Sequence, residues 1–142
     1  MRKLKVLLLL IFIIVTGCSN SQNFSITYSD VKSADGNIQK WMEKNRKKNG
    51  IYLGKNITNN QEEIYYLYIN YSNPVADKYS SINAVSMNSN SSSSININVS
   101  PKPSDQKSES EKIFYIAVKE SSLKKINLNG EVMKTSSIPS IQ

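Results

Sequence analysis

The chain has 142 residues, of which 18 are basic and 11 acidic, and its net charge is +7. It contains no histidine and a single cysteine, Cys18. This composition leaves enough residues for one domain with a core, and it excludes a disulfide within the chain, histidine-based catalysis and the usual zinc sites.

The first 17 residues have the layout of a secretory signal peptide. Arg2, Lys3 and Lys5 precede an uninterrupted apolar run over 6–15, which is shorter than the roughly 20 residues that span a bilayer. This leader holds three of the 18 basic residues and no acidic one, so the remainder keeps an excess of four positive charges. That excess is too small to indicate a nucleic-acid partner.

The leader ends in Val15-Thr16-Gly17-Cys18: a branched aliphatic residue, a small residue, glycine and cysteine. This order resembles the lipobox of bacterial lipoproteins. The resemblance implies a diacylglycerol on the Cys18 sulfur and a lipid anchor in the cell membrane, facing the extracytoplasmic side. Residues 18–23 then form a short lipidated tether. The alternatives are an ordinary signal peptide with a chance cysteine, or a short uncleaved anchor.

The sequence after the tether predicts one globular domain over residues 24–134. Its class is α+β, mostly β: an antiparallel sheet or a small β-sandwich, with one N-terminal amphipathic helix after the signal-peptide helix. Segment 62–71 has apolar or aromatic residues on both faces, which predicts a central strand. Residues 135–142 are expected to form a loose tail. The expected strands are 24–28, 51–53, 62–71, 79–87, 94–99, 113–118 and a hairpin turning at Asn129-Gly130.

One segment, between about residues 33 and 48, has the period of a helix. Ile38, Trp41 and Met42 lie on one face, so we expect them to pack into the core. The alternative for Trp41 is an exposed binding anchor. Asn49-Gly50 predicts a left-handed cap at the C-terminal end of this helix.

A family resemblance accompanies these elements. Gln39 to Tyr52, which contains Trp41 and Gly50, resembles the helix and entry strand of the C-terminal domain of the protease-complex subunit PrcB. The later strands extend the resemblance over 38–128. It implies a membrane-attached lipoprotein that binds and stabilises a partner protease.

The loop before the strand at Tyr79 departs from this family. The family loop typically reads Pro-Thr-Gly-Gly-Tyr, whereas Val75-Ala76-Asp77-Lys78 follow Pro74 here. Without glycine, backbone conformations with positive φ are disfavoured in this loop. The loop also resembles the Asn-Pro-Thr-Thr-Gly-Tyr loop of chagasin-type cysteine-protease inhibitors, which are β-sandwiches.

The same loop is the candidate partner-binding site, because binding residues concentrate in loops that a rigid sheet holds. Its candidate residues are Asn73, Pro74, Asp77 and Tyr79. A second loop over 100–112 is expected to be solvated and to lie beside it. A plain connecting loop is the alternative reading.

The sequence therefore predicts a membrane-anchored protein-binding module that stabilises or modulates a secreted or membrane-linked protease. No catalytic residue, cofactor or metal site is expected, because no nucleophile elbow and no calcium-loop spacing occur. One alternative is an envelope lipoprotein that stacks glycans on the tyrosine-rich strand, which requires exposed tyrosines. Another is a surface structural protein without a single partner. The tyrosines that glycan stacking would use are Tyr65, Tyr66, Tyr68 and Tyr71.

Overall fold

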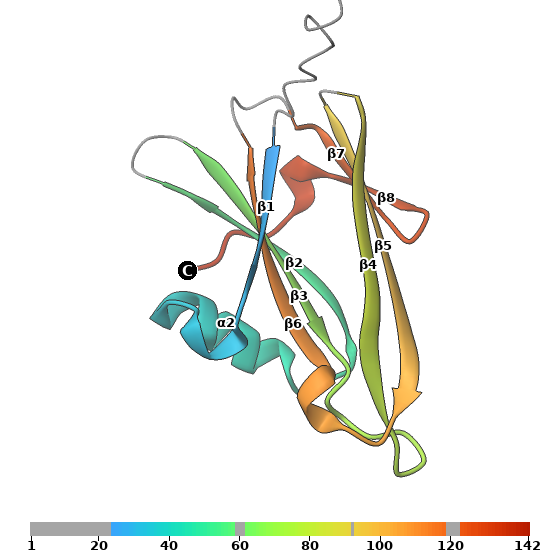
Figure 1. Cartoon of the computed structure of the whole chain (residues 1–142). Helices are drawn as coiled ribbons and strands as arrows, with labels where there is room; N and C mark the ends of the chain where they lie inside the picture. Colours follow the sequence, from blue (N-terminus) through green and yellow to red (C-terminus); the bar gives the residue numbers. More distant parts are fainter. Residues whose placement is uncertain (1–23, 59–61, 92, 119–122) are drawn as a thin grey trace, which may run out of the picture.

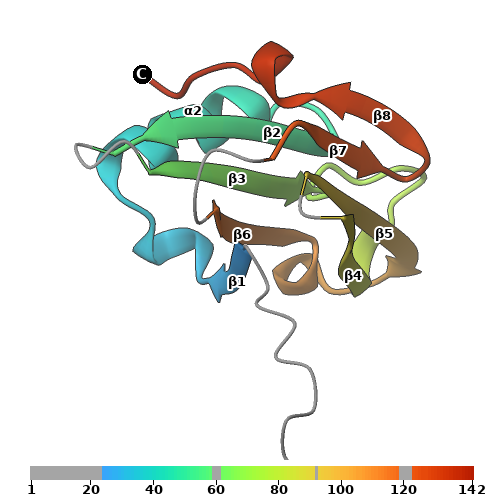
Figure 2. The same cartoon turned by 90° about the horizontal axis from the view of Figure 1, so that it is seen from above.

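The computed structural model describes residues 24–58, 62–91, 93–118 and 123–142. The fold is α+β and mostly β, as predicted: two four-stranded sheets pack face to face, and a helix covers the outer face of one of them (Figures 1 and 2). The first sheet is antiparallel, in the order β1 (Phe24–Ser29), β6 (Glu111–Val118), β3 (Glu63–Asn70), β2 (Gly50–Ile57). The second has the order β4 (Tyr79–Ser91), β5 (Ser94–Ser104), β7 (Lys125–Leu128), β8 (Glu131–Lys134), with β5 and β7 parallel.

The helix α2 (Gly36–Asn45) packs through the apolar face that the sequence predicts. Asp35 caps its first turn by accepting a hydrogen bond from the Ile38 amide at 3.0 Å. Ile38 and Met42 are buried against the first sheet, and the half-buried Trp41 ring stands edge-on to Tyr68 at 6.1 Å between centroids. Three 3₁₀ turns complete the fold: η1 (Val31–Ser33), η2 (Lys107–Glu109) and η3 (Thr135–Ser137).

Strand β3 is buried on both faces, which confirms the predicted central strand. Tyr65, Leu67 and Ile69 point into the sandwich, whereas Tyr66 and Tyr68 point toward α2. All three tyrosines are buried and Tyr71 is half-buried. The exposed tyrosine surface that the glycan-stacking alternative requires is therefore missing on this strand, because alternation places its rings in two cores.

The predicted left-handed cap at Asn49-Gly50 is also wrong. The helix ends at Asn45, and Arg46 follows in right-handed geometry. Gly50 starts β2 without a positive φ. The side chains of Asn70, at the end of β3, and Asn73, in the next loop, both donate to the carbonyl of the C-cap residue Arg46, so the helix ends without a glycine cap.

The hairpin between β4 and β5 is longer than predicted. The strands reach Ser91 and Ser104, and so include segments that the sequence predicts as loops. Pro101 and Pro103 fit within β5 because its pairing with β7 covers only Ser94–Ile97, so the prolines have a described partner strand on one side. The type I′ turn between β7 and β8 is confirmed, with φ of 50° and 90° at Asn129 and Gly130.

The C-terminal segment is docked rather than loose, so the prediction for 135–142 is wrong. Ile138 is 4% exposed and Ile141 8%. The Lys55 amide donates to the Pro139 carbonyl at 3.0 Å, and the Ile141 amide donates to the Lys55 carbonyl at 2.9 Å. Gly54 makes room for this contact, since a Cβ there would lie 2.7 Å from Ile141 Cδ1. The segment therefore extends the first sheet beyond β2.

The leader and tether, with Val15, Thr16, Gly17 and Cys18, lie outside the described residues. Within the part of the chain that is described, no helix is both long enough and apolar enough to cross a membrane.

The docked C-terminal segment predicts a specific loss of stability. Ile138→Ala should lower the free energy of unfolding by about 2–4 kcal/mol, because it removes a fully packed side chain. Val132→Ala, at a position 59% exposed on the nearby β8, should change it by less than about 0.5 kcal/mol. Urea denaturation measures both values. Equal, small effects would mean that the segment is loose in solution.

Candidate partner-binding site

The strand register defines two ends of the domain. Phe24 pairs with Val118, which also pairs with Glu63 on the other side of β6. At the opposite end of the sheet, Asn70 pairs with Glu111. We call the end at Phe24 the tether end and the end at Glu111 the distal end.

The predicted binding loop, residues 72–79, lies at the distal end, at the bottom of Figure 1. Its tip is a tight two-residue turn in which Val75 and Lys78 exchange backbone hydrogen bonds of 2.8 and 3.1 Å. Ala76 and Asp77 adopt φ of 50° and 62°. The expectation that this loop avoids positive φ is wrong, and these left-handed residues cost about 1–2 kcal/mol each.

Polar contacts with the end of α2 hold the base of this loop. The Asn73 amide donates to Asn49 Oδ1 at 3.0 Å, and the Asn49 side chain donates back to the Asn73 carbonyl at 2.7 Å. Asn73 Nδ2 donates to the Arg46 carbonyl at 2.9 Å. Buried Asn70 donates to the carbonyls of Arg46 and Lys48 at 3.0 and 2.9 Å. Asn73 therefore positions the loop.

The other candidate residues differ in exposure. Pro74 and Asp77 are exposed at the tip, while Tyr79 is half-buried at the start of β4. Val75 is 73% exposed. It was not predicted as a binding residue, although a valine between a proline and a polar turn makes an apolar tip. The tip that a partner can reach therefore runs from Pro74 to Lys78 and includes Val75 and Asp77.

The second predicted loop lies beside the first, as expected. Tyr79 pairs with Ser104, and Lys78 Nζ lies 3.3 Å from Asp105 Oδ1. Both side chains of this ion pair are well exposed, so it contributes little to stability. It does bring the residues around 105 next to the tip of the 72–79 loop.

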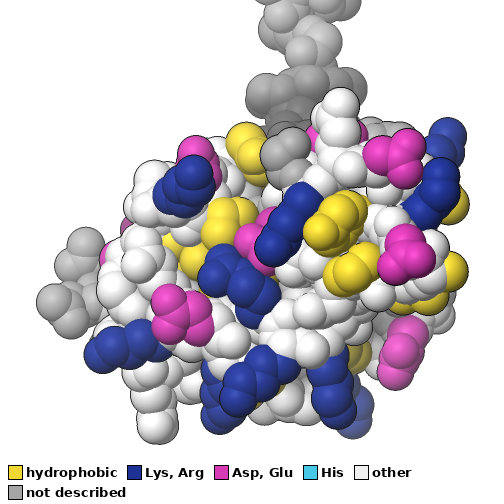
Figure 3. All heavy atoms as spheres, turned by 90° about the horizontal axis from the view of Figure 1, so that it is seen from below, with side chains coloured by type: hydrophobic (Ala, Val, Ile, Leu, Met, Phe, Trp, Pro, Cys, Tyr) yellow, Lys and Arg dark blue, Asp and Glu magenta, His cyan; other side chains and the backbone are white. Residues whose placement is uncertain are grey.

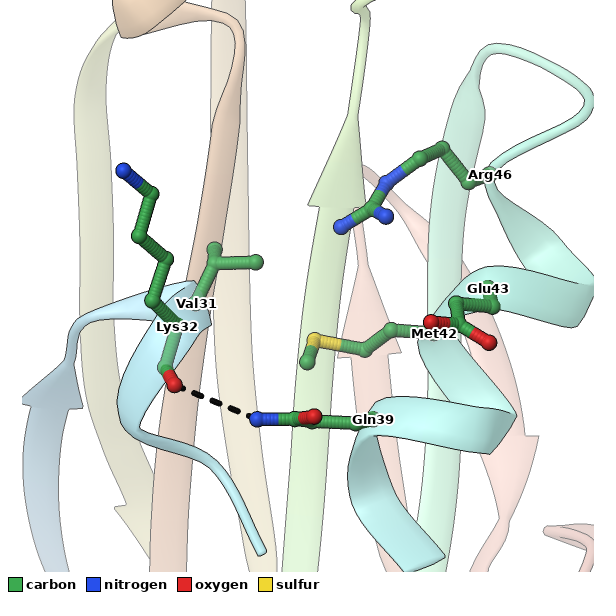
Figure 4. Close-up of a pocket in the computed structure, with 6 residues that line it drawn as sticks. All are labelled: Val31, Lys32, Gln39, Met42, Glu43 and Arg46. Carbon is green, nitrogen blue, oxygen red and sulfur yellow. Dashed lines mark hydrogen bonds between the residues drawn. The ribbon is translucent and has the colours of Figure 1, made fainter. Parts of the chain in front are cut away.

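A groove next to these loops was not predicted. It consists of a cavity of about 630 Å³ and a smaller one of about 290 Å³, which share Val31, Lys32 and Arg46. Figure 4 shows the smaller cavity, where Gln39 Nε2 donates to the Lys32 carbonyl at 3.1 Å. The larger one is lined by Tyr28, Asp30, Val31, Lys32, Arg46, Ser72, Lys107 and Glu111.

An ion pair between Arg46 and Glu111 lines the groove. Two bonds join the guanidinium to the carboxylate, at 2.8 Å from Nε and 3.2 Å from Nη2. Partial burial lowers the pKa of Arg46, but the hydrogen bond and charge of Glu111 outweigh it and raise that pKa. These residues lie 65 positions apart, and nothing in the sequence indicates that they meet.

The groove as a whole carries mixed charge. The basic side chains of Lys32, Arg46 and Lys107 face the acidic ones of Asp30, Glu43 and Glu111 across the two cavities. Figure 3 shows the distal end, where basic, acidic and apolar side chains are interspersed. Such a surface suits a polypeptide with both charge signs better than a small anion. Within the described residues, no cluster of acidic side chains could hold a metal ion.

Tyr68 lies buried near the Arg46–Glu111 pair. Its hydroxyl makes no hydrogen bond of good geometry with the described residues, although it lies close enough to Arg46 and Glu111 to interact with both, whereas the Tyr65 hydroxyl donates to Glu63 Oε2 at 2.6 Å. Burial, helped by the negative charge of Glu111 and opposed by Arg46, raises the pKa of Tyr68 to about 12.

Comparisons with protein-family models, with curated proteins and with solved structures find no significant match to this chain. The resemblance to PrcB therefore stays a prediction.

The polar contacts below the loop predict that Asn73→Ala destabilises the domain by about 1–3 kcal/mol, because it leaves the Arg46 carbonyl with one donor fewer and loosens the loop base. Pro74→Ala, one residue along and exposed, should cost less than about 0.5 kcal/mol. Thermal denaturation of both variants tests this. Equal transition temperatures would contradict a positioning role for Asn73.

The buried tyrosines predict loss of stability at alkaline pH. Tyr68 loses its proton near pH 10 when unfolded but near 12 when folded, so stability is complete below pH 10 and falls as the pH rises toward 12. Tyr68→Phe should reduce this fall by up to about 1.4 kcal/mol per pH unit.

At pH 7 the same variant should be as stable as the parent or more stable, since it removes an unpartnered buried hydroxyl. Tyr65→Phe is the control and should lose about 1 kcal/mol with its bond to Glu63. Urea titrations at pH 7 and pH 11 measure both effects. A destabilised Tyr68→Phe at pH 7 would show that its hydroxyl has a partner in solution.

Proposed function

We propose that this protein is a lipid-anchored, extracytoplasmic protein-binding module that contacts its partner through the distal end of the domain. The observation that supports this proposal is the strand register, which separates the residue nearest the tether, Phe24, from the 72–79 loop by the length of the sheet. A lipid on Cys18 then leaves the distal end facing away from the bilayer.

The tether is short in this arrangement. Cys18 precedes Phe24 by six residues, which span at most about 20 Å when fully extended. The domain thus stays next to the bilayer surface, and its effective concentration toward membrane-linked partners rises without any additional contact.

The chemistry of the distal end supports a protein as the partner. An apolar tip at Val75, the exposed Tyr28 and the mixed charges of the groove lie together at this end. Apolar and aromatic contacts surrounded by polar groups are typical of protein interfaces. The resemblance to PrcB makes a secreted or membrane-linked protease the proposed partner class, with stabilisation or modulation as the role. The proposal involves no catalytic step.

The alternatives have less support. Glycan stacking on the tyrosine-rich strand lacks its surface, because Tyr65, Tyr66 and Tyr68 are buried. The other alternative is a structural surface protein without a single partner. Crosslinking distinguishes it from the proposed module, because a structural protein should yield many weak crosslinks instead of one dominant partner.

Site-specific photo-crosslinking in the native membrane tests this proposal. A photoreactive residue at Val75 should capture one dominant protein, and mass spectrometry should identify a protease. The matched control places it at Ile57, which is 57% exposed and lies at the tether end, where it pairs with Glu63. Ile57 should capture lipid or no dominant protein.

Cys18→Ala tests the anchor in the same experiment. It should move the protein from the membrane fraction to the soluble fraction and weaken the Val75 crosslink by lowering local concentration. Retention of Cys18→Ala in the membrane would refute the lipid anchor. Identical crosslinks from Val75 and Ile57 would refute the distal site.

A further inference from the structure

The two flanks of the sandwich differ in how they are covered. One flank lies between the edge strands β2 and β8, and the C-terminal segment covers it by pairing with Lys55 and burying Ile138. The other flank lies between the edge strands β1 and β4 (Figure 2). We call it the open flank, because no described segment pairs with the outer edge of β1 or β4.

Half-buried apolar side chains line the open flank. Phe24 and Ile26 of β1, Val85 and Met87 of β4, and Phe114 of β6 pack against the core while keeping part of their surface in solvent. On the covered flank, Ile138 is buried in the core, while Ile51 and Met133 there stay half-buried. The open flank therefore presents half-buried apolar residues that an added segment would cover. No described segment of the chain covers them.

The edge strands of the open flank also lack two of the usual protections against added strands, charges and prolines, although β4 has register shifts on either side of residues 84–89. Neither β1, with six residues, nor β4, with 13, contains a charged residue or a proline. On the covered flank, β2 contains Lys55 and β8 contains Glu131 and Lys134. Natural edge strands commonly carry charges, prolines or bulges that prevent further pairing. This contrast within one molecule marks the open flank as a place where pairing is permitted.

Strand β4 offers a regular stretch for such pairing. Register shifts occur between Ile82 and Ala84 and between Ser89 and Ser91, and the six residues 84–89 between them pair regularly with β5. Their outward backbone groups form a continuous row of donors and acceptors. The exposed side chains here, Ser86, Asn88 and Ser89, are small and polar, so they do not block an approaching strand.

We propose that residues 84–89 of β4 bind an extended, uncharged segment of a partner protein as an added strand. Backbone hydrogen bonds provide the affinity in this mode, and alternate side chains provide the specificity. The inward side chains of the added strand cover Phe24, Ile26 and Met87, which calls for apolar residues at every second position. This surface is separate from the 72–79 loop and lies along the side of the domain.

A second copy of the chain fits this edge poorly, an argument that rests on the proposed lipid anchor. A closed two-fold dimer through one edge pairs the strands antiparallel. Because β4 runs from the distal end toward the tether end, such a dimer points the two tether ends in opposite directions. The 13 residues of β4 span roughly 40 Å, whereas a six-residue tether reaches at most about 20 Å. In the upright orientation proposed above, with the distal end facing away from the bilayer, only one of the two copies can therefore stay anchored.

A peptide-binding experiment on the purified full-length lipoprotein in detergent micelles tests the proposal. The probe is a capped peptide with the sequence of Ser94–Ser100, an uncharged alternating segment that already pairs with the inner edge of β4. At saturating peptide, amide hydrogen exchange over 84–89 should slow by about tenfold or more. Exchange in β8 should not change.

Two N-methylated versions of the peptide sharpen the result. Methyl groups on one set of alternate amides should abolish the protection, and methyl groups on the other set should leave it intact, because an added strand pairs along one of its edges. If neither methylated peptide lost the protection of residues 84–89, or if both lost it equally, the peptide would bind without forming an added strand. No protection by the unmodified peptide would overturn the proposal.

A photoreactive residue at Asn88 distinguishes, in the membrane, a bound partner segment from a second copy of the chain. It should crosslink the added peptide, and Val132 on the covered flank should not. A crosslinked species of twice the chain mass from Asn88 would assign the edge to a second copy and overturn the partner segment. These readouts do not depend on the Val75 crosslink, so failure of either proposal is seen separately.

Discussion

Strand β3 is the element on which the rest of the structure depends. It is hydrogen-bonded to β2 and β6, and both of its faces are buried, one under α2 and one under the second sheet. Leu67 and Ile69 contribute to the sandwich core, and Tyr66 and Tyr68 to the helix core. The helix presents only a narrow apolar face, and the second sheet is rich in serine and asparagine. Each therefore depends on this strand for the apolar surface that it covers.

The end of β3 also organises the distal end. Asn70, fully buried, binds the carbonyls of Arg46 and Lys48 and accepts hydrogen bonds from the amide and hydroxyl of Ser72. One side chain thereby closes the helix end and directs the chain into the 72–79 loop. The rigid base and exposed apolar tip of this loop follow from the same contacts. A tip held in this way loses little conformational entropy when it binds a partner.

The open flank is a second proposed binding surface, separate from the distal loop. The described chain closes one side of its sandwich with its own C-terminal segment and leaves the other side with uncharged edges and half-buried apolar residues. If both proposals hold, a partner contacts the distal loop and adds a strand along the side of the domain. Two separated contacts on one tethered domain would fix the partner's orientation relative to the bilayer.

Local pattern in the sequence determined much of the fold. Alternation defined β1 and β3, helical period placed Ile38 and Met42 in a core, and Asn129-Gly130 specified its turn, because each depends on neighbours within a few residues. The lipobox-like segment predicted an anchor that the described residues do not include. Tertiary structure alone decided the docking of Ile138, the capping of α2 by Asn70 and the pairing of Arg46 with Glu111. These contacts join residues far apart in the chain, where the gain comes from burial and from satisfying polar groups that no local pattern records.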